Sequence, residues 1–268
     1  MTVTGGVGVP EEVPDNGEGR GTSVLKNGIA VLRAFAVDEP LLGVSEIAAK
    51  VGLHKSTVSR ILATLELEDL VERDPLTRRF RLGLGVIAMA GPLLADLDVR
   101  RVAYPLLHDL SRRTGETVAL MVWDGGEAVC VEQVPSLRQV KHTTPLGTRY
   151  DTAASSSVQV FLAHLEPFTV RSLLMKGTID FPGLTEAALD AYLIRLHDVV
   201  DRGFATNYGE TSFEEVGVAA PVFDHRGEPV AAVLLSAPRF RVSTEQLGLF
   251  EKAVIDAAGA ITSRLGGT

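Results

Sequence analysis

The stretch that decides the fold of the first part of this chain is Val44-Ser45-Glu46-Ile47-Ala48-Ala49-Lys50-Val51-Gly52-Leu53-His54-Lys55-Ser56-Thr57-Val58-Ser59-Arg60-Ile61-Leu62-Ala63-Thr64-Leu65. Apolar residues recur at helical spacing on both sides of a glycine, which predicts two short helices joined by a tight turn at Gly52. We expect Ser45 to cap the first helix and the second to run from Lys55 to about Glu68. The basic segment 72–82 then predicts a hairpin whose turn lies at 74–77. This order is typical of a winged helix-turn-helix, which places one helix in the major groove of DNA. A generic helical hairpin is the alternative.

The second of these helices has two contrasting faces. At about 100° per residue, one face collects the apolar side chains of Val58, Ile61, Leu62 and Leu65. The opposite face collects Ser56, Ser59, Arg60 and Ala63. Small hydroxyl groups and one arginine suit contact with base edges and phosphates, whereas an ordinary solvent-facing helix would carry Glu and Lys there. The helix begins with residues 55–57, and the free backbone N–H groups of such a first turn favour the binding of a phosphate.

The hairpin carries three arginines next to its second strand. Alternation along that strand predicts Arg79 and Arg81 on one face, with Phe80 and Leu82 on the other. Arginines at the wing of such a module follow the DNA backbone or enter the minor groove, and a solvated charged strand is the alternative. The candidate DNA-contacting residues are therefore Ser45, Lys55, Ser56, Thr57, Ser59, Arg60, Arg78, Arg79 and Arg81.

The charge distribution permits DNA binding in a chain that is acidic as a whole. The 268 residues carry a net charge of −8, divided as −3 over 1–22, +1 over 23–83 and −6 over 84–268. Specific DNA binding needs a local basic surface, and segment 23–83 is the least acidic part. The length suits two domains. Without an apolar stretch of membrane-spanning length or a signal peptide, a bacterial cytoplasmic protein without membrane contact is expected.

Composition and periodicity divide the chain into four segments. Residues 1–22 are expected to form a disordered acidic tail, and a helix is expected at 24–36. Segment 84–99 is helical in pattern, with an interruption at Gly91-Pro92, and is expected to link the two domains. The remainder predicts helices at 100–114, 155–165, 185–201 and from 243 onward, and strands at 117–123, 128–134, 216–223 and 230–236. The helix at 185–201 is expected to bury Leu189, Tyr192, Leu193, Leu196 and Val200. This order predicts an α+β domain with a mixed or antiparallel sheet.

Several strings that match enzyme motifs are not in the context that their chemistry needs. Gly83-Leu84-Gly85-Val86-Ile87-Ala88 fits a dinucleotide-binding pattern, but the strand before it is Arg-rich and the βαβ unit is missing. Ser23-x-x-Lys26 lacks the partner motifs of penicillin-binding enzymes. The single cysteine, Cys130, lies in an apolar strand, which predicts a small core residue; a reactive thiol is the alternative. The sequence therefore predicts a protein that is not an enzyme and that uses no metal or cofactor.

Residues 52–62 and 79–83 resemble the winged helix-turn-helix of IclR-type bacterial transcription regulators. Segments 114–120, 202–205, 218–224 and 227–233 resemble the effector domain of the same family, so the similarity covers about residues 23–265. The resemblance implies a winged helix-turn-helix at 23–83, a linker helix at 84–99 and a GAF-like α/β effector domain at 100–268. It also implies a homodimer, or a dimer of dimers, that binds a palindromic double-stranded DNA operator.

The resemblance further implies that a small metabolite, an organic acid or a related compound, binds the cupped sheet and changes operator affinity. The residues that it implies for effector binding are Met121, Thr143, Ser155, Ser156, Ser157, Tyr208, Gly217, Leu235 and Ser236. This chain departs from the family pattern at two places. Ser157-Val158-Gln159 replaces a small residue followed by Gly-Lys, and Gly217 replaces a Cys or Ser. Two alternatives remain: a regulator that has lost its ligand, and an enzyme or sensor whose first domain only mediates dimerisation.

Overall fold

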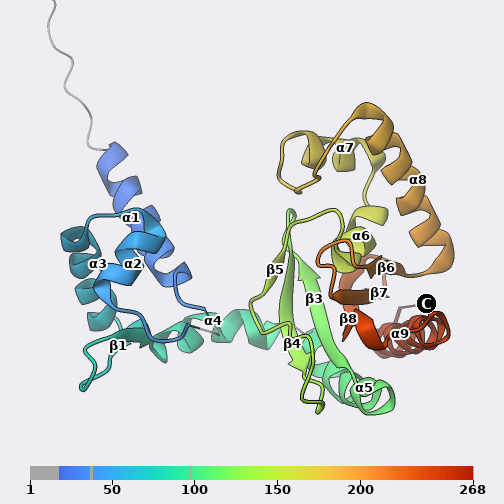
Figure 1. The fold of residues 1–268 in the computed structure, drawn as a ribbon, viewed down its shortest axis with the longest axis horizontal. Coiled ribbons are helices and arrows are strands. Elements are labelled where there is room, and N and C mark those ends of the chain that lie inside the picture. Colours follow the sequence, from blue (N-terminus) through green and yellow to red (C-terminus); the bar gives the residue numbers. More distant parts are fainter. Residues whose placement is uncertain (1–17, 37–38, 97, 268) are drawn as a thin grey trace, which may run out of the picture. The chain divides into compact units, whose positions relative to one another are not determined.

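The computed structural model describes residues 18–36, 39–96 and 98–267, and it divides the chain into two compact units, Met1–Leu93 and Leu94–Thr268 (Figure 1). The division falls in helix α4 (Gly85–Asp96), inside the segment expected to be the linker. The expected interruption at Gly91-Pro92 is wrong, because α4 continues through Pro92. A proline removes one backbone hydrogen bond, and helix-forming residues on both sides maintain the helix around it.

The first unit combines three helices and a hairpin among its described residues: α1 (Glu18–Arg33), α2 (Val44–Val51), α3 (Lys55–Leu67), β1 (Val71–Arg73) and β2 (Phe80–Leu82). Residues 18–22 are helical, so the expected tail is wrong there, and its residues 1–17 lie outside the described residues. The cap of α2 is Gly43 and not Ser45, which lies in the first turn. The helix begins earlier because Glu46 Oε2 accepts a hydrogen bond from Gly43 N at 2.7 Å. Gly52 ends α2 with a φ of 67°, as predicted.

A small apolar core joins the hairpin to the helices. Its buried members include Val31, Ile47, Val58, Leu62 and Phe80, each at most 5% exposed. Strands β1 and β2 pair antiparallel. The backbones of Leu42 and Phe80 also exchange two hydrogen bonds, of 2.9 and 2.8 Å. Phe80 therefore anchors the wing both through its side chain and through its backbone.

Gly83 and Gly85 let the chain pass close to the loop between α3 and β1. A Cβ atom at Gly83 would lie 2.2 Å from the carbonyl oxygen of Asp69. That oxygen accepts a hydrogen bond from Gly85 N at 3.0 Å. Close packing thus accounts for the glycine pair that fits a dinucleotide-binding pattern.

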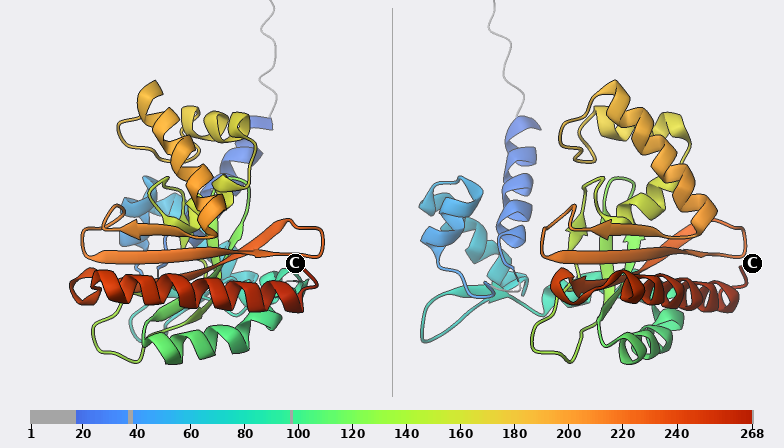
Figure 2. Two further views of the ribbon diagram at one scale, coloured as in Figure 1. Left: turned by 90° about the vertical axis from the view of Figure 1, so that its right-hand side faces the viewer. Right: turned by 45° about the vertical axis from the view of Figure 1, so that its right-hand side comes forward.

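The second unit is a six-stranded antiparallel sheet with helices on both faces (Figures 1 and 2). Its elements are α5 (Asp98–Thr114), β3 (Thr117–Trp123), β4 (Ala128–Val134), β5 (Arg149–Tyr150), α6 (Ser156–Ala163), α7 (Pro167–Met175), α8 (Glu186–Arg202), β6 (Ala205–Tyr208), β7 (Glu215–Phe223), β8 (Pro229–Pro238), the 3-10 turn η1 (Arg239–Arg241) and α9 (Thr244–Arg264). The strand order is β5-β4-β3-β8-β7-β6. The predicted α+β class and antiparallel sheet are confirmed, whereas α7, β5 and β6 were not predicted.

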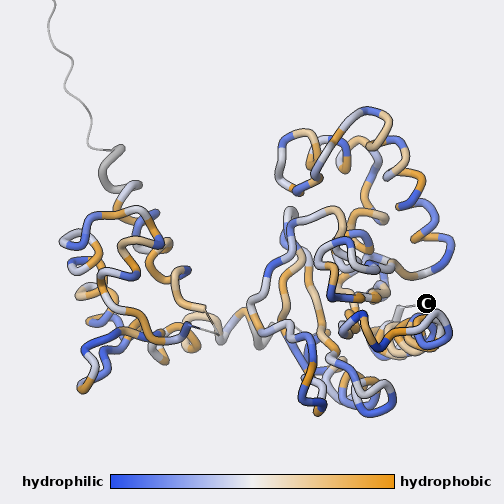
Figure 3. Tube along the Cα trace, in the orientation of Figure 1, coloured by the Kyte–Doolittle hydropathy of each residue, from blue (hydrophilic) through white to orange (hydrophobic). Residues whose placement is uncertain are grey.

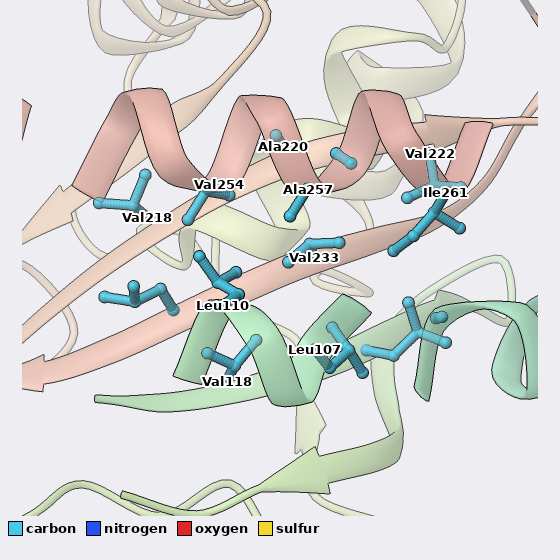
Figure 4. Packing of buried hydrophobic residues seen from close by; sticks show 14 of the residues in the cluster. Leu107, Leu110, Val118, Val218, Ala220, Val222, Val233, Val254, Ala257 and Ile261 are labelled. Carbon is cyan, nitrogen blue, oxygen red and sulfur yellow. The ribbon is translucent and has the colours of Figure 1, made fainter. Parts of the chain in front are cut away.

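The two faces of the sheet carry separate cores. Helices α5 and α9 cover one face, where Leu107, Val118 and Val254 pack together (Figures 2 and 4). We call the other face the inner face; it buries Met121 and Cys130 against side chains of α6, α7 and α8. Strand β3 is apolar along most of its length in Figure 3, in agreement with its burial on both faces.

Helix α8 turns a slightly different side to the inner face than expected. Its buried residues are Leu189, Tyr192, Leu196 and Val199, whereas Val200 is 45% exposed. The buried residues are spaced by three or four, so they form one stripe. Val200 lies about 100° away from Val199 around the helix axis, and the prediction for Val200 is wrong for that reason.

Candidate functional site

Helix α3 presents the polar face that its sequence predicts. Ser56, Ser59 and Arg60 are exposed, whereas Val58 and Leu62 are fully buried. Thr57, Ile61 and Leu65 are half-buried, and Ser45 in α2 is exposed. Lys55 is the first residue of α3, and His54 Nδ1 before it lies 3.0 Å from Ser56 Oγ. The exposed hydroxyl groups, the arginine and the free N–H groups of the first turn give this face the chemistry of a recognition helix.

The basic side chains of the first unit differ in how far they are neutralised. Lys55 and Arg60 make no ion pair within the described residues, so their charges are available to phosphates or base edges. Arg79 instead contacts Glu46, and Arg81 contacts Glu72. These four side chains are 43–53% exposed, so water screens both pairs, and a DNA phosphate can replace either glutamate.

The turn of the wing has the geometry that its sequence predicts. Asp74 Oδ1 accepts hydrogen bonds from the backbone N–H groups of Thr77 and Leu76, at 2.6 and 3.1 Å. These bonds, that of Thr77 first, hold the pKa of Asp74 below its ordinary value. Arg78 follows with a φ of 60° and an exposed side chain. The turn therefore presents Arg78 to solvent, while Phe80 holds the strand behind it.

The inner face of the second unit carries a row of small and polar residues. Strand register places Asn207, Gly217, Ser236 and Thr117 side by side across β6, β7, β8 and β3. The N-terminus of α6 lies over this row, because a Cβ atom at Gly217 would be 3.0 Å from Ser156 Oγ. Three of the expected effector-binding residues, Ser156, Gly217 and Ser236, therefore lie within one small region.

The other expected effector-binding residues differ in where they lie relative to that row. Ser155 and Ser157 are buried at the start of α6, with their hydroxyl oxygens 3.0 Å apart. Met121 is buried on the inner face. Thr143 is exposed, in a loop whose His142 carbonyl accepts a hydrogen bond from Thr117 Oγ1 at 2.5 Å. That loop thus crosses the end of the row without burying Thr143.

Two expected effector-binding residues point away from the inner face. Leu235 belongs to the core under α5 and α9, and the Tyr208 hydroxyl donates to the carbonyl oxygen of Val242, before α9, at 3.1 Å. Successive side chains of a strand point to opposite faces, so Leu235 cannot share a face with Ser236. Tyr208 likewise lies opposite to its neighbour Asn207, so neither Leu235 nor Tyr208 lines the inner face, and a part for them in effector binding stays a prediction.

Asn207 is an inner-face residue that sequence reasoning missed. It is 3% exposed, and its Oδ1 accepts hydrogen bonds from the backbone of Glu210 and Thr211, at 2.8 and 3.3 Å. Its Nδ2 also contacts Thr211 Oγ1. The sequence signal was the alternation of strand 205–208, but a four-residue strand is too short to recognise reliably from its pattern alone.

The inner face carries little charge and no reactive thiol. Among the described strand residues, those on the side of Gly217 and Met121 include one charged residue, Glu215, which is half-buried. Burial raises the pKa of the Cys130 thiol to about 12, and its Sγ donates to the carbonyl oxygen of Thr144 at 3.0 Å. Cys130 is therefore a protonated core residue, and the prediction for it is confirmed.

A cavity of about 740 Å³ opens at the end of the sheet where β8 finishes. Lys141, His142, Tyr208, Phe213, Arg239 and Phe240 are among the residues that line it. Arg239 stacks on the rings of Tyr208 and Phe213, at 4.8 and 4.6 Å. Within the described residues no helix is long and apolar enough to cross a membrane, and no cluster of three acidic, His or Cys side chains is arranged to hold a metal ion.

Two family profiles match this chain. The profile described as "IclR helix-turn-helix domain" matches residues 24–75, and "Bacterial transcriptional regulator IclR C-terminal" matches residues 92–263. The HTH-type transcriptional regulator KipR of Bacillus subtilis is 29% identical over 260 residues, which are 94% of this chain and 100% of KipR. The HTH-type transcriptional repressor AllR of Escherichia coli is 28% identical over 248 residues, 92% of each chain. These relatives are named as regulators of transcription, which implies a role other than catalysis.

Solved structures agree with these matches. A domain of an IclR-family transcriptional regulator is 58% identical and covers 63% of this chain and 97% of its own, with a TM-score of 0.62. An IclR homologue from Microbacterium hydrocarbonoxydans, complexed with 4-hydroxybenzoate, is 25% identical over 90% of this chain and 98% of its own, with a TM-score of 0.75. Sequence and structure comparisons thus point to one family.

Proposed function

Because this chain belongs to the IclR family of bacterial transcriptional regulators, we propose that it binds a palindromic operator as a dimer and that a small effector on the inner face changes its operator affinity. The observation that carries the DNA-binding part is the exposed face of α3. Its hydroxyl groups and Arg60 lie opposite fully buried Val58 and Leu62, so the helix is held rigidly while its polar face stays free. A rigid helix with a small, hydrogen-bonding face is what major-groove readout requires.

The wing adds charge beside the recognition helix. Arg78 is exposed at the turn, and Arg79 and Arg81 lie in screened ion pairs that a phosphate can displace. Contacts of this kind position a protein on the duplex, while base contacts from Ser56, Ser59 and Arg60 would specify the sequence. Non-specific binding should therefore depend on the wing, and operator discrimination on α3.

The dimer is proposed from the apolar surface of α4. Ile87, Met89 and Leu93 of α4 are 63–70% exposed, and Leu84 directly before the helix is 78% exposed, which is an unusual amount of exposed apolar surface for one short segment. A second copy of the same helix is the partner that a palindromic operator calls for, because two recognition helices must reach two half-sites. The resemblance to the family points to the same assembly.

The effector part rests on the gathering of Ser156, Gly217 and Ser236 on the inner face, at the position that the family resemblance indicates. A relative has been crystallised with 4-hydroxybenzoate, which supports a small-molecule role for this domain. A ligand that binds only one state of a regulator shifts the equilibrium between its states. Binding on the inner face would in this way raise or lower operator affinity.

Fluorescence anisotropy with the full-length protein and labelled DNA from upstream of its own gene tests the DNA-binding part. We expect saturable binding that weakens by orders of magnitude between about 50 and 200 mM salt, because phosphates are neutralised on binding. A shuffled duplex of the same length is the control. Failure to bind this DNA and that of the neighbouring genes more tightly than the shuffled duplex would contradict the proposal.

A further inference from the structure

Buried polar atoms without a partner gather on one side of the second unit. Within the described residues, four buried side-chain atoms have no hydrogen-bond partner: Gln133 Nε2, Thr144 Oγ1, Gln159 Oε1 and Ser236 Oγ. Gln133 pairs in register with Ala119, which belongs to the inner-face core, so it points to the inner face. Ser236 belongs to the row that includes Gly217 and Thr117. Gln159 lies in α6, which covers this face.

These atoms are an unusual feature of a folded core. Native proteins satisfy nearly all buried polar groups, and exceptions call for a ligand, an ordered water molecule or a functional reason. Thr144 Oγ1 is set apart from the others because the nearby Tyr150 hydroxyl is a potential partner for it. The other three comprise an amide donor, an amide acceptor and a hydroxyl group, which together match a ligand that both donates and accepts hydrogen bonds.

The same region offers no positive charge to an anion. Helix α6 contains no ionisable side chain, and Glu215 is the one charged group among the described strand positions that face this side. Three cations lie at this end of the sheet: Arg195 contacts Glu210 and the carbonyl oxygen of Thr206, Lys141 donates to the carbonyl oxygen of Ser136, and Arg239 stacks on Tyr208, which points away from the inner face. A buried carboxylate would lose its hydration and gain no cationic partner, and Glu215 would repel it.

We propose that the effector of this protein is an uncharged, hydrogen-bonding molecule, such as a carboxamide or a hydroxyl compound, and not a carboxylate. The inference rests on the proposed effector role of the inner face. A neutral carbonyl can accept hydrogen bonds from the free N–H groups at the start of α6, while its amide or hydroxyl group pairs with Gln133, Gln159 and Ser236.

Matched acid and amide pairs test the proposal on the full-length protein. The probes are 4-hydroxybenzoate with 4-hydroxybenzamide, nicotinate with nicotinamide, and lactate with lactamide, each assayed by thermal shift and by operator binding. We expect at least one amide to raise the melting temperature and change operator affinity, with its acid binding at least about tenfold more weakly. Acids that bind as well as their amides would overturn the ligand class but leave the effector role intact. If no compound of either kind binds, the effector role fails as well.

A pair of serine variants tests the unpartnered atoms directly. Ser236→Ala removes a hydroxyl without a partner, so we expect the melting temperature of the unliganded protein to rise by about 2 °C and the response to the amide to weaken at least about fivefold. Ser111 is the control, because its buried Oγ donates to the carbonyl oxygen of Glu116 at 2.9 Å. Ser111→Ala should lower the melting temperature and leave the amide response unchanged. If Ser236→Ala destabilises the protein as much as Ser111→Ala does, the hydroxyl is structural and the proposal is overturned.

Discussion

Arg60 is the residue on which operator discrimination should depend most. It is exposed on α3 and makes no ion pair within the described part of the chain, so its guanidinium can reach a guanine edge. Arg60→Ala should weaken operator binding by at least about 1 kcal/mol while changing binding to shuffled DNA much less. Parallel anisotropy titrations on the two duplexes measure this difference. Arg264→Ala, an exposed arginine of α9, is the charge-matched control. Equal losses on both duplexes would leave Arg60 only a phosphate contact.

Glu72 should restrain DNA binding through its contact with Arg81. Glu72→Gln removes the carboxylate that competes with a phosphate for this arginine. Because an exposed ion pair is worth at most about 1 kcal/mol, we expect DNA affinity to rise by up to about fivefold. The slope of log affinity against log salt concentration should become steeper by up to the amount that about one additional phosphate contact contributes. Glu68→Gln is the control, since it removes the same charge from a residue that pairs with none of the described cations. If both variants change the salt dependence equally, the effect is one of net charge and the Arg81 contact plays no part.

Cys130 should behave as an unreactive thiol in the folded protein. Burial raises its pKa to about 12 from an ordinary 9.0, so the nucleophilic thiolate is scarce at neutral pH, and the stability linked to this shift is present below about pH 9 and lost as the pH rises toward 12. We expect a thiol reagent at pH 8 to modify the native protein at least about a hundredfold more slowly than the protein unfolded in guanidinium chloride. The single cysteine makes the absorbance signal unambiguous. Rapid labelling of the native protein would show that the strand opens far more readily than its burial implies.

The sequence predicted which face of a single helix or strand a residue occupies. It did not predict contacts between residues of two different elements. Helical phasing separated Arg60 from Leu62, and the structure confirms that one is exposed and the other buried. The partners of Arg79 and Arg81 could not be predicted, because Glu46 and Glu72 approach them only after the chain has folded. The resemblance to the family gave the neighbours Leu235 and Ser236 together, and the side chains of two successive strand residues point to opposite faces, so only Ser236 faces inward.

At the scale of elements, the join between α3, the wing and α4 depends on the close approach at Gly83. A methyl group there would lie 2.2 Å from Asp69 O, and this atom belongs to the backbone, so it cannot rotate away. Gly83→Ala should lower stability by about 1–3 kcal/mol and weaken DNA binding by displacing the wing. Gly28→Ala is the matched control, because α1 leaves open space around Gly28 and alanine favours a helix by up to about 1 kcal/mol. Thermal unfolding followed by circular dichroism should show opposite shifts. A neutral Gly83→Ala variant would mean that the wing adjusts at little cost.

The sequence predicted the helices and strands that have a clear pattern of their own. It did not predict the short strands that form only because they pair with another strand of the folded chain. The hairpin of β3 and β4 has an Asp-Gly-Gly-Glu turn between two apolar runs, and its predicted bounds match the structure. Strand β6 has only four residues and exists because it pairs with β7, while β5 has two. The row that includes Asn207 therefore could not be assembled from sequence, although Ser156 and Gly217 were both expected at the site.

At the scale of the whole molecule, the exposed apolar side chains of α4 should control assembly. Ile87 is 63% exposed, so a glutamate there would be tolerated in a monomer but would place a charge in an interface between two copies. We expect Ile87→Glu to weaken dimerisation at least about tenfold in analytical ultracentrifugation, while the melting temperature changes little at concentrations where the dimer is already dissociated. Binding to a palindromic duplex should weaken more than binding to a single half-site. In a dimer, binding of one subunit holds the other subunit close to the second half-site, and a monomer lacks this advantage. Ile194→Glu is the control, since Ile194 on α8 is 67% exposed and α8 has no part in the proposed interface. A stable dimer in Ile87→Glu would move the interface away from α4 and leave the four exposed side chains without a role.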